Sequence, residues 1–192
     1  MSLTLQLVLI YLGAVIVVLL GLWVILPALT GLPWVPTREP RIRRALEMAR
    51  VQPGETVYDL GAGDGRVLLV AAREFGARAV GIEISPLHCW QARVRAAFAG
   101  LTGQVVVRRG DFYRADLREA DVVFLYITSA QAGKVKSLLE GQLRDGARVV
   151  SISADIPGWE PVAVDKPQLI FLYQMPPAPG GVESYLMRQS LS

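Results

Sequence analysis

The first 37 residues contain no Lys, Arg, Asp or Glu, and this uncharged start constrains the chain more than any other feature. Within it, 20 consecutive residues from Leu7 to Leu26 lack a strongly polar side chain. As a helix they would be roughly 30 Å long, the thickness of the hydrocarbon core of a bilayer. Apolar side chains surround the whole circumference, which argues against a helix buried in a soluble core. We therefore predict a transmembrane helix in residues 1–26, with residues 3–26 contacting the bilayer.

A secretory signal peptide is the alternative interpretation of this segment. It would begin with positive charge and end at a small-residue cleavage site, and the sequence shows neither. Positive charge instead follows the segment, at Arg38, Arg41, Arg43, Arg44 and Arg50. By the positive-inside rule, we expect a single-pass protein of the inner (cytoplasmic) membrane with its globular domain in the cytoplasm.

The remainder of the chain has the composition of an ordinary globular domain. Its net charge of +3 is mild, and we expect no nucleic acid partner. Cys89 is the only cysteine and His88 the only histidine, so we expect no disulfide and no metal, and assign both residues structural roles. We expect four parts: a transmembrane helix (1–26), a membrane-proximal linker (27–37), one domain (38–175) and a tail without an assigned role (176–192).

Short apolar runs alternate with segments of helical spacing after residue 38. This alternation predicts an α/β domain in which parallel strands are covered by helices on both faces. Ser85-Pro86 supports one boundary, because Ser caps helices and Pro suits the first helical position. We predict strands at 56–60, 79–84, 104–108, 121–127 and 148–153, and helices at 41–51, 65–75, 86–99 and 130–143.

Three glycines, Gly61, Gly63 and Gly65, follow the first predicted strand, where such sheets bind their ligands. Glycine lets backbone amides approach a ligand that side chains would keep away. The spacing is G-x-G-x-G with Arg66 next, so the dinucleotide pattern G-x-G-x-x-G is broken at its third glycine. Two nearby acids, Asp59 and Asp64, suit a ligand with an ammonium group better than a pyrophosphate.

Acidic and aromatic residues follow the next two strands. Glu83 lies 22 residues after Gly61, where a carboxylate can accept both ribose hydroxyls of an adenosine. Asp111 can accept from the adenine amino group, and Phe112 can stack on the base. Taken singly, Asp64 could be a helix cap and Phe112 a core residue. Together these residues predict an S-adenosylmethionine site.

Longer motifs extend this interpretation over about residues 33–175. They are PWVPT (33–37), VYDLGAGDGR (57–66), VGIEIS (80–85), GDF (110–112), LYI (125–127), GARVVS (146–151) and IPGWEP (156–161). With them the chain resembles class I S-adenosylmethionine-dependent methyltransferases. More narrowly, it is similar to the archaeal protein lysine methyltransferase and the mitochondrial ATP synthase c-subunit and adenine nucleotide translocase lysine methyltransferases.

The resemblance implies a Rossmann-like, seven-stranded sheet closed by an antiparallel hairpin, near 161–164 and 168–174. It also implies roles for individual residues. Trp34 and Thr37 would cover the methionine end of the cofactor, and Asp59, Gly61 and Gly63 would hold its amino acid part. Glu83 would bind the ribose, and Asp111 and Phe112 the adenine.

Lysine is the expected methyl acceptor, and it must be neutral to react, although its reference pKa is about 10.4. We hypothesise that an apolar slot between WVPT and Tyr126 removes water from the incoming ammonium and lowers its pKa, with the Tyr126 hydroxyl orienting it. Because the linker spans at most about 35 Å, the acceptor should belong to a membrane or membrane-proximal protein.

Three rival functions remain open at this point. A lipid or small-molecule N-methyltransferase would also suit the membrane position. A nicotinamide-dependent oxidoreductase is disfavoured by Arg66 at the third glycine position. A non-catalytic membrane protein that binds the cofactor is the third.

Overall fold

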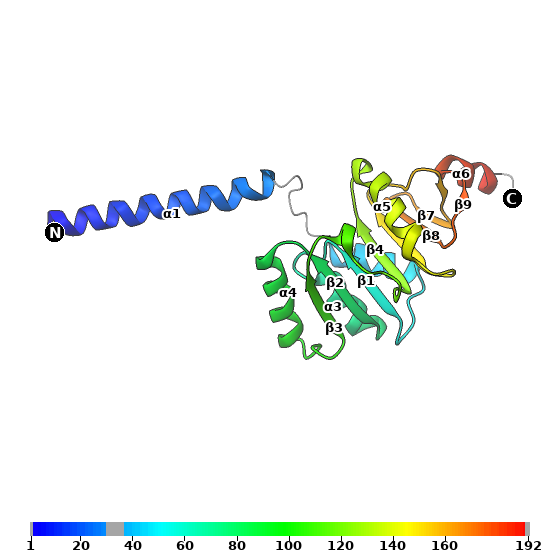
Figure 1. Cartoon of the computed structure of the whole chain (residues 1–192), viewed down its shortest axis with the longest axis horizontal. Helices are drawn as coiled ribbons and strands as arrows, with labels where there is room; N and C mark the ends of the chain where they lie inside the picture. Colours follow the sequence, from blue (N-terminus) through cyan, green and yellow to red (C-terminus); the bar gives the residue numbers. More distant parts are fainter. Residues whose placement is uncertain (1, 30–36, 191–192) are drawn as a thin grey trace. The chain divides into compact units, whose positions relative to one another are not determined.

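The structure is a computed structural model that describes residues 2–29 and 37–190, and it divides into two units, Met1–Pro36 and Thr37–Ser192. The first unit contains α1 (Leu3–Leu29) (Figure 1). From Leu3 to Gly21 this helix is apolar, exposed and long enough to cross a membrane. By length, composition and position, it fits both a membrane span and a signal segment. Trp34 and most of the linker 27–37 lie outside the described residues.

The second unit is built on a seven-stranded sheet of order β3-β2-β1-β4-β5-β8-β7. The first five strands of this order are parallel, and β8 runs antiparallel to β5 and to β7. This confirms the predicted fold class, including the closing hairpin. The bounds are β1 Thr56–Leu60, β2 Arg78–Glu83, β3 Val105–Arg109, β4 Val122–Tyr126, β5 Arg148–Ile152, β7 Ala163–Asp165 and β8 Ile170–Gln174.

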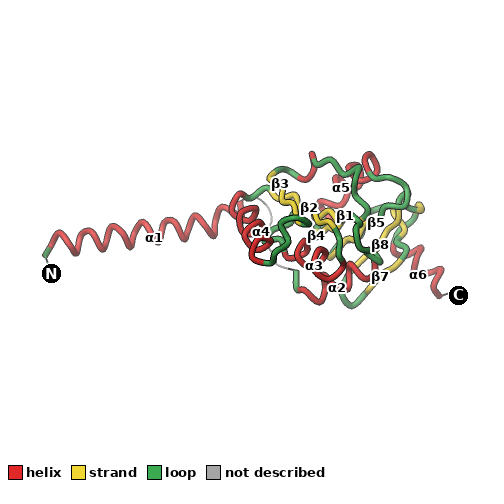
Figure 2. Tube along the Cα trace, turned by 90° about the horizontal axis from the view of Figure 1, so that it is seen from below, coloured by secondary structure: helices red, strands yellow, loops and turns green. Residues whose placement is uncertain are grey.

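Helices cover both faces of this sheet (Figure 2). One face packs against α2 (Glu39–Met48), α3 (Arg66–Phe75) and α4 (Pro86–Phe98). The other face packs against the 3-10 turn η1 (Phe112–Arg114) and α5 (Ser129–Gln142). Central strands are buried on both sides, which is why they read as continuous apolar runs. Each fully buried large side chain stabilises the domain by about 1.5–3 kcal/mol.

Local sequence fixes where two of the helices begin. The Ser85 side chain accepts from the backbone amide of His88 and caps α4, with Pro86 next, as predicted. At the start of α5, Thr128 and Gln131 form a reciprocal capping box.

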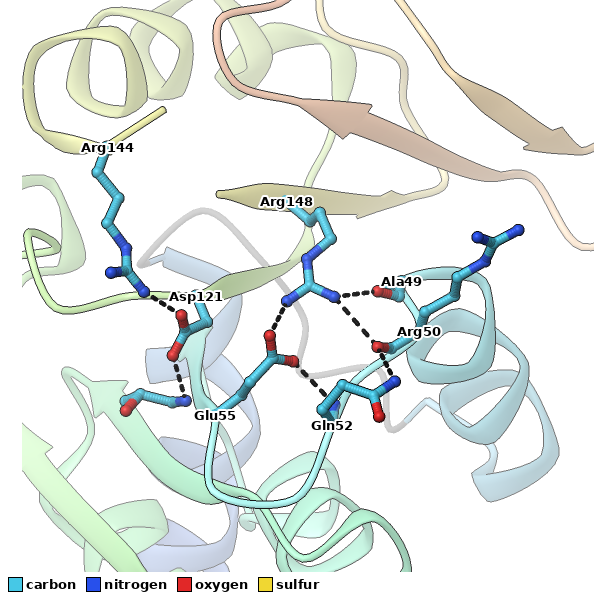
Figure 3. Close-up of polar contacts among 8 residues, drawn as sticks. Ala49, Arg50, Gln52, Glu55, Asp121, Arg144 and Arg148 are labelled. Atoms are coloured by element: carbon cyan, nitrogen blue, oxygen red, sulfur yellow. Dashed lines mark hydrogen bonds and ion pairs between the residues drawn. The ribbon is translucent and has the colours of Figure 1, made fainter. Parts of the chain in front are cut away.

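A polar network ties together the amino-terminal ends of three neighbouring strands (Figure 3). The Arg148 guanidinium donates to Glu55 and to the carbonyl of Ala49. Asp121 pairs with Arg144 and accepts from the backbone amide of Thr56. Because this network lies at the opposite ends of the strands from the glycine turn, it serves the fold and leaves the carboxyl ends open for ligands.

The tail, to which the sequence analysis assigns no role, forms regular secondary structure. A short strand, β9 (Ala178–Pro179), pairs with β6 (Trp159–Glu160), and α6 (Val182–Ser190) follows. Arg188 forms an ion pair with the buried carboxylate of Glu160. The tail therefore packs on the segment that follows β5.

Candidate active site

The glycine turn lies between β1 and α3 and has an unusual backbone. Gly61, Gly63 and Gly65 have φ angles of +92°, +53° and +80°, in the region that favours glycine. A Cβ at Gly61 would have no atom within 4 Å, so the backbone is open there. A Cβ at Gly65 would lie 2.7 Å from the Cβ of Ala92. The first glycine thus leaves space beside the turn, and the third lets α4 pack closely on it.

Glu83 joins this turn to the end of β2. Its Oε2 accepts from the Gly63 amide and its Oε1 from the Ser85 amide, both at 2.8 Å. The side chain is buried. Each carboxylate oxygen can accept a further hydrogen bond, so Glu83 could also receive two ligand hydroxyls. The position matches the prediction from the spacing.

Asp59 is more deeply buried than the neighbouring acids Asp64 and Glu83. It is 3% exposed, and within the described residues no donor is hydrogen-bonded to its carboxylate. Burial, followed by the negative charges of Glu83 and Asp64, raises the pKa of Asp59 to about 8. The carboxyl is therefore mostly protonated at neutral pH, and a cation bound beside it would favour the ionised form.

Asp64 is held by two arginines. The Arg66 guanidinium donates to both carboxylate oxygens, at 3.0 and 2.7 Å, and Arg95 of α4 donates to Oδ2 at 2.5 Å. Burial alone would raise the pKa of Asp64, but these hydrogen bonds and charges lower it. The carboxylate therefore links α3 to α4. As a cofactor ligand, Asp64 remains a prediction.

Thr37, the first residue of the second unit, also lies beside this turn. Its carbonyl accepts from Arg66 at 3.2 Å, which places the start of the domain beside the first turn of α3. Trp34, the other residue expected to cover the methionine end of a cofactor, lies outside the described residues. The sequence carries no local signal for this contact between positions 29 residues apart.

Asp111 and Phe112 follow β3 at the neighbouring part of the sheet edge. Asp111 is exposed and accepts from the Tyr113 amide at 3.0 Å, while the half-buried Phe112 packs on the Tyr113 ring with centroids 4.3 Å apart. Ile84, which sequence reasoning included in the preceding strand, is 69% exposed directly after Glu83. An apolar side chain at this position could cover a base. The sequence feature that could have indicated this role is the apolar residue directly after the acid in VGIEIS.

Tyr126 ends β4 with its side chain 37% exposed. The Arg41 guanidinium lies 5.9 Å from the centre of its ring and also donates to the Gln168 carbonyl at 2.8 Å and to Ser153 Oγ at 3.3 Å. Ser153 and Leu169 have φ angles of +75° and +49°, which are strained for residues with side chains. The side of the expected apolar slot formed by Tyr126 therefore carries the positive charge of Arg41. From the sequence, Arg41 was interpreted only as one of the charges that follow the apolar segment, and its position beside Tyr126 was not predicted.

His88 and Cys89 lie on α4, away from Tyr126. Cys89 is buried in the inner face of that helix, and its thiol donates to the Glu83 carbonyl at 3.3 Å. Burial, together with the charge of Glu83, raises the pKa of this thiol. A buried thiol that is held protonated fits the structural role expected for Cys89.

Comparison with known proteins bears on the function of this site. Residues 59–163 match the family model described as the ANTKMT methyltransferase domain. A protein-lysine N-methyltransferase of Saccharolobus islandicus is 40% identical over 135 residues, which are 70% of this chain and 84% of that protein. The adenine nucleotide translocase lysine N-methyltransferase of Mus musculus is 35% identical over 139 residues, covering 72% of this chain and 60% of that protein.

Solved structures give the same result for the fold and the cofactor. A crystal structure described as an RNA methyltransferase from Salinibacter ruber, in complex with S-adenosyl-L-homocysteine, has a TM-score of 0.72 and 42% identity. The similarity covers 74% of this chain and 94% of that chain. An S-adenosylmethionine-dependent methyltransferase from Thiobacillus denitrificans, also with S-adenosyl-L-homocysteine, has a TM-score of 0.55 and 28% identity over 69% of this chain and 54% of that chain.

Proposed function

The chain belongs to the ANTKMT family of S-adenosylmethionine-dependent methyltransferases, and we propose that it is a membrane-anchored enzyme that methylates lysine side chains of membrane or membrane-proximal proteins. The observation that carries the proposal is the 40% identity to an archaeal protein-lysine N-methyltransferase over 84% of that protein. The similarity covers only 60% of the mouse adenine nucleotide translocase lysine N-methyltransferase. We therefore do not propose the translocase as the substrate of this chain.

The residues present suit the cofactor. The buried carboxyl of Asp59 lacks a partner within the described residues and would receive the ammonium group, beside the open backbone of Gly61 and the left-handed turn at Gly63. Glu83 would accept the ribose hydroxyls. Asp111, Phe112 and the exposed Ile84 would hold the base, and Trp34 and Thr37 the methionine end. When bound, the cofactor supplies an electrophilic methyl group on a sulfonium.

The acceptor amine would enter beside Tyr126. A free lysine with a pKa near 10.4 is charged at neutral pH and cannot attack. The Arg41 guanidinium near the Tyr126 ring disfavours a second positive charge there, and so increases the neutral fraction of the incoming amine. The Tyr126 hydroxyl would orient that amine. Unchanged turnover in Tyr126→Phe would remove the hydroxyl from the mechanism.

The membrane location rests on α1 and on the charges that follow it. The helix is apolar and exposed from Leu3 to Gly21, and residues 38–50 on the domain side carry five arginines against two glutamates, which favours a cytoplasmic domain. Deleting residues 1–26 should preserve activity on soluble peptides and reduce it on acceptors embedded in membranes. Calorimetry of cofactor binding controls for the folding of the shortened chain. Equal loss on both kinds of acceptor would contradict a tethering role.

RNA is a second candidate acceptor, because the Salinibacter ruber structure is described as an RNA methyltransferase. One experiment separates the acceptor classes. Cell membranes and cytosol are incubated with the full chain and cofactor carrying a radiolabelled methyl group, then fractionated into protein, RNA and lipid. We expect label in protein, on lysines identified by mass spectrometry. Label confined to RNA or to lipid would overturn the lysine proposal and leave the family assignment intact.

A further inference from the structure

Helix α4 is apolar on two opposite sides. Its inner side, formed by Cys89, Ala92 and Ala96, is buried against the sheet and α3. A second set of apolar residues faces outward at helical spacing, and we call it the outer stripe: Leu87, Trp90, Val94 and Phe98. At 100° per residue these four side chains fall within an arc of about 80°, opposite the inner side.

The outer stripe is exposed to solvent. Leu87 is 44%, Trp90 61% and Phe98 89% exposed, and Val94 is half-buried. Single exposed apolar residues are ordinary, but two aromatic rings and two aliphatic side chains along one helix face mark a surface that binds something.

The charges around the stripe indicate what it binds. From Ile84 to Gly110 the chain carries four arginines and neither Asp nor Glu. Arg93 and Arg95 flank the stripe on its two sides, at helical angles of about 100° from its centre. Arg93 donates to the Val107 carbonyl and Arg95 to Asp64, and each guanidinium has further N–H donors beyond these contacts. Arg108 and Arg109 are exposed at the end of the neighbouring β3.

The surface beside Phe98 is also rich in arginine, although three of its guanidinium groups already pair with carboxylates: Arg43 with Glu39 and Glu74, and Arg66 and Arg95 with Asp64. Phe98 borders a hollow of about 380 Å³ whose lining contains Arg43, Arg66, Arg73 and Arg95 against two glutamates. Guanidinium groups at such a surface suit phosphate headgroups, and their aliphatic stems can lie along the apolar boundary.

We propose that α4 is an interfacial helix, whose outer stripe enters the boundary between headgroups and acyl chains of an anionic bilayer while the flanking arginines contact the headgroups. Aromatic and aliphatic side chains bordered by arginine are the composition of helices that lie in this layer. A bilayer is favoured over a protein partner because the same chain carries an exposed apolar helix long enough to cross one. The inference thus rests on the proposed membrane location.

A spin-label experiment tests this on the full chain in lipid nanodiscs. In a Cys89→Ala background, one label is placed on the stripe by Phe98→Cys and a matched control label on the exposed surface of α5 by Lys134→Cys. Collision rates with oxygen, which concentrates in acyl chains, and with a nickel chelate, which stays in water, are measured in anionic and in zwitterionic discs. Calorimetry of cofactor binding checks that both labelled chains are folded.

In anionic discs we expect the oxygen-to-nickel ratio at position 98 to exceed that at position 134 several-fold, and the excess to shrink in zwitterionic discs and in Arg108→Gln/Arg109→Gln. A label at 98 that is as accessible to nickel as the control overturns the inference. So does a label shielded from both reagents, which would indicate a protein partner or a second copy. Alkaline carbonate extraction of the same membranes tests the anchoring by α1 separately, since the label at 98 reports on α4 whether or not α1 spans.

Discussion

The buried carboxyl of Asp59 should lower the stability of the ligand-free enzyme, and Asp59→Asn should raise it. Asn has nearly the shape of a protonated Asp and cannot ionise. In the folded chain the pKa of Asp59 is raised to about 8, whereas an unfolded Asp ionises near 3.8. As the pH rises between these values, only the unfolded state loses its proton, so this group's contribution to stability falls with pH and levels off above about 8.

The size of the effect follows from the same two values. Neutral pH is about three units above the ordinary pKa of 3.8, and each unit corresponds to about 1.4 kcal/mol. The cost of Asp59 at pH 7 is therefore at most roughly 4 kcal/mol, since relaxation and water entry reduce it. For a domain of this size, each kcal/mol shifts the melting temperature by about 2–4 °C.

Urea unfolding of wild type and Asp59→Asn between pH 4.5 and 9 measures this difference. We expect the two proteins to be nearly equal in stability at the acidic end and to diverge progressively toward pH 8, with the variant more stable. The variant should also bind S-adenosylmethionine at least tenfold more weakly, because the ionised carboxylate is the partner of the ammonium group. A stability difference that does not change with pH would refute the reasoning about burial and ionisation.

Three further predictions concern the glycine turn, the carboxylate proposed to accept the ribose hydroxyls, and the site proposed for the methyl-accepting amine. Gly65→Ala should destabilise the domain by roughly 2–4 kcal/mol in urea unfolding, and Gly61→Ala, equally strained in φ but free of a clash, by roughly 1–2 kcal/mol; equal costs would exclude the contact with α4 as the cause. Glu83→Gln should weaken cofactor binding at least tenfold in calorimetry, because its amide cannot accept from two backbone donors and two hydroxyls; unchanged affinity would exclude Glu83 as the ribose acceptor. Arg41→Gln should move the pH–rate profile to higher pH without changing cofactor affinity, whereas Arg44→Gln on the same helix, which loses only a pair with Asp165, should leave the profile in place.

The sheet and the glycine turn were predictable because their signals are local. Strands buried on both faces are short apolar runs, and each was predicted within a residue or two of its observed bounds. The turn between β1 and α3 requires positive φ angles, and the three residues that adopt them are glycines, which can be recognised in the sequence. The spacing also placed Glu83 correctly at the end of β2, since parallel strands bring their carboxyl ends to one edge, whereas its role toward the ribose stays a prediction.

The missing parts of the site depend on long-range contacts. Arg41 reaches Gln168 across 127 positions, and Arg95 reaches Asp64 across 31. An arginine in a sequence can be exposed to solvent, form an ion pair or line a binding site. Which of these applies depends on the residues that the fold brings next to it. The outer stripe of α4 was hidden for a different reason. With apolar residues on two opposite sides, the helix has no single polar face to reveal its exposed side.

If α4 docks at the bilayer, the position of the helix governs the height of the cofactor site above the lipid. Its first residue is three positions after Glu83, and its Ala92 lies in contact range of the glycine turn at Gly65. Arg95 binds Asp64 in that same turn. A linker can only limit the distance of a domain from the membrane, whereas a helix packed against the site also fixes its orientation. The proposed lysine specificity then needs no large recognition surface, because lysines held near the bilayer surface would be presented to a site already at the right height.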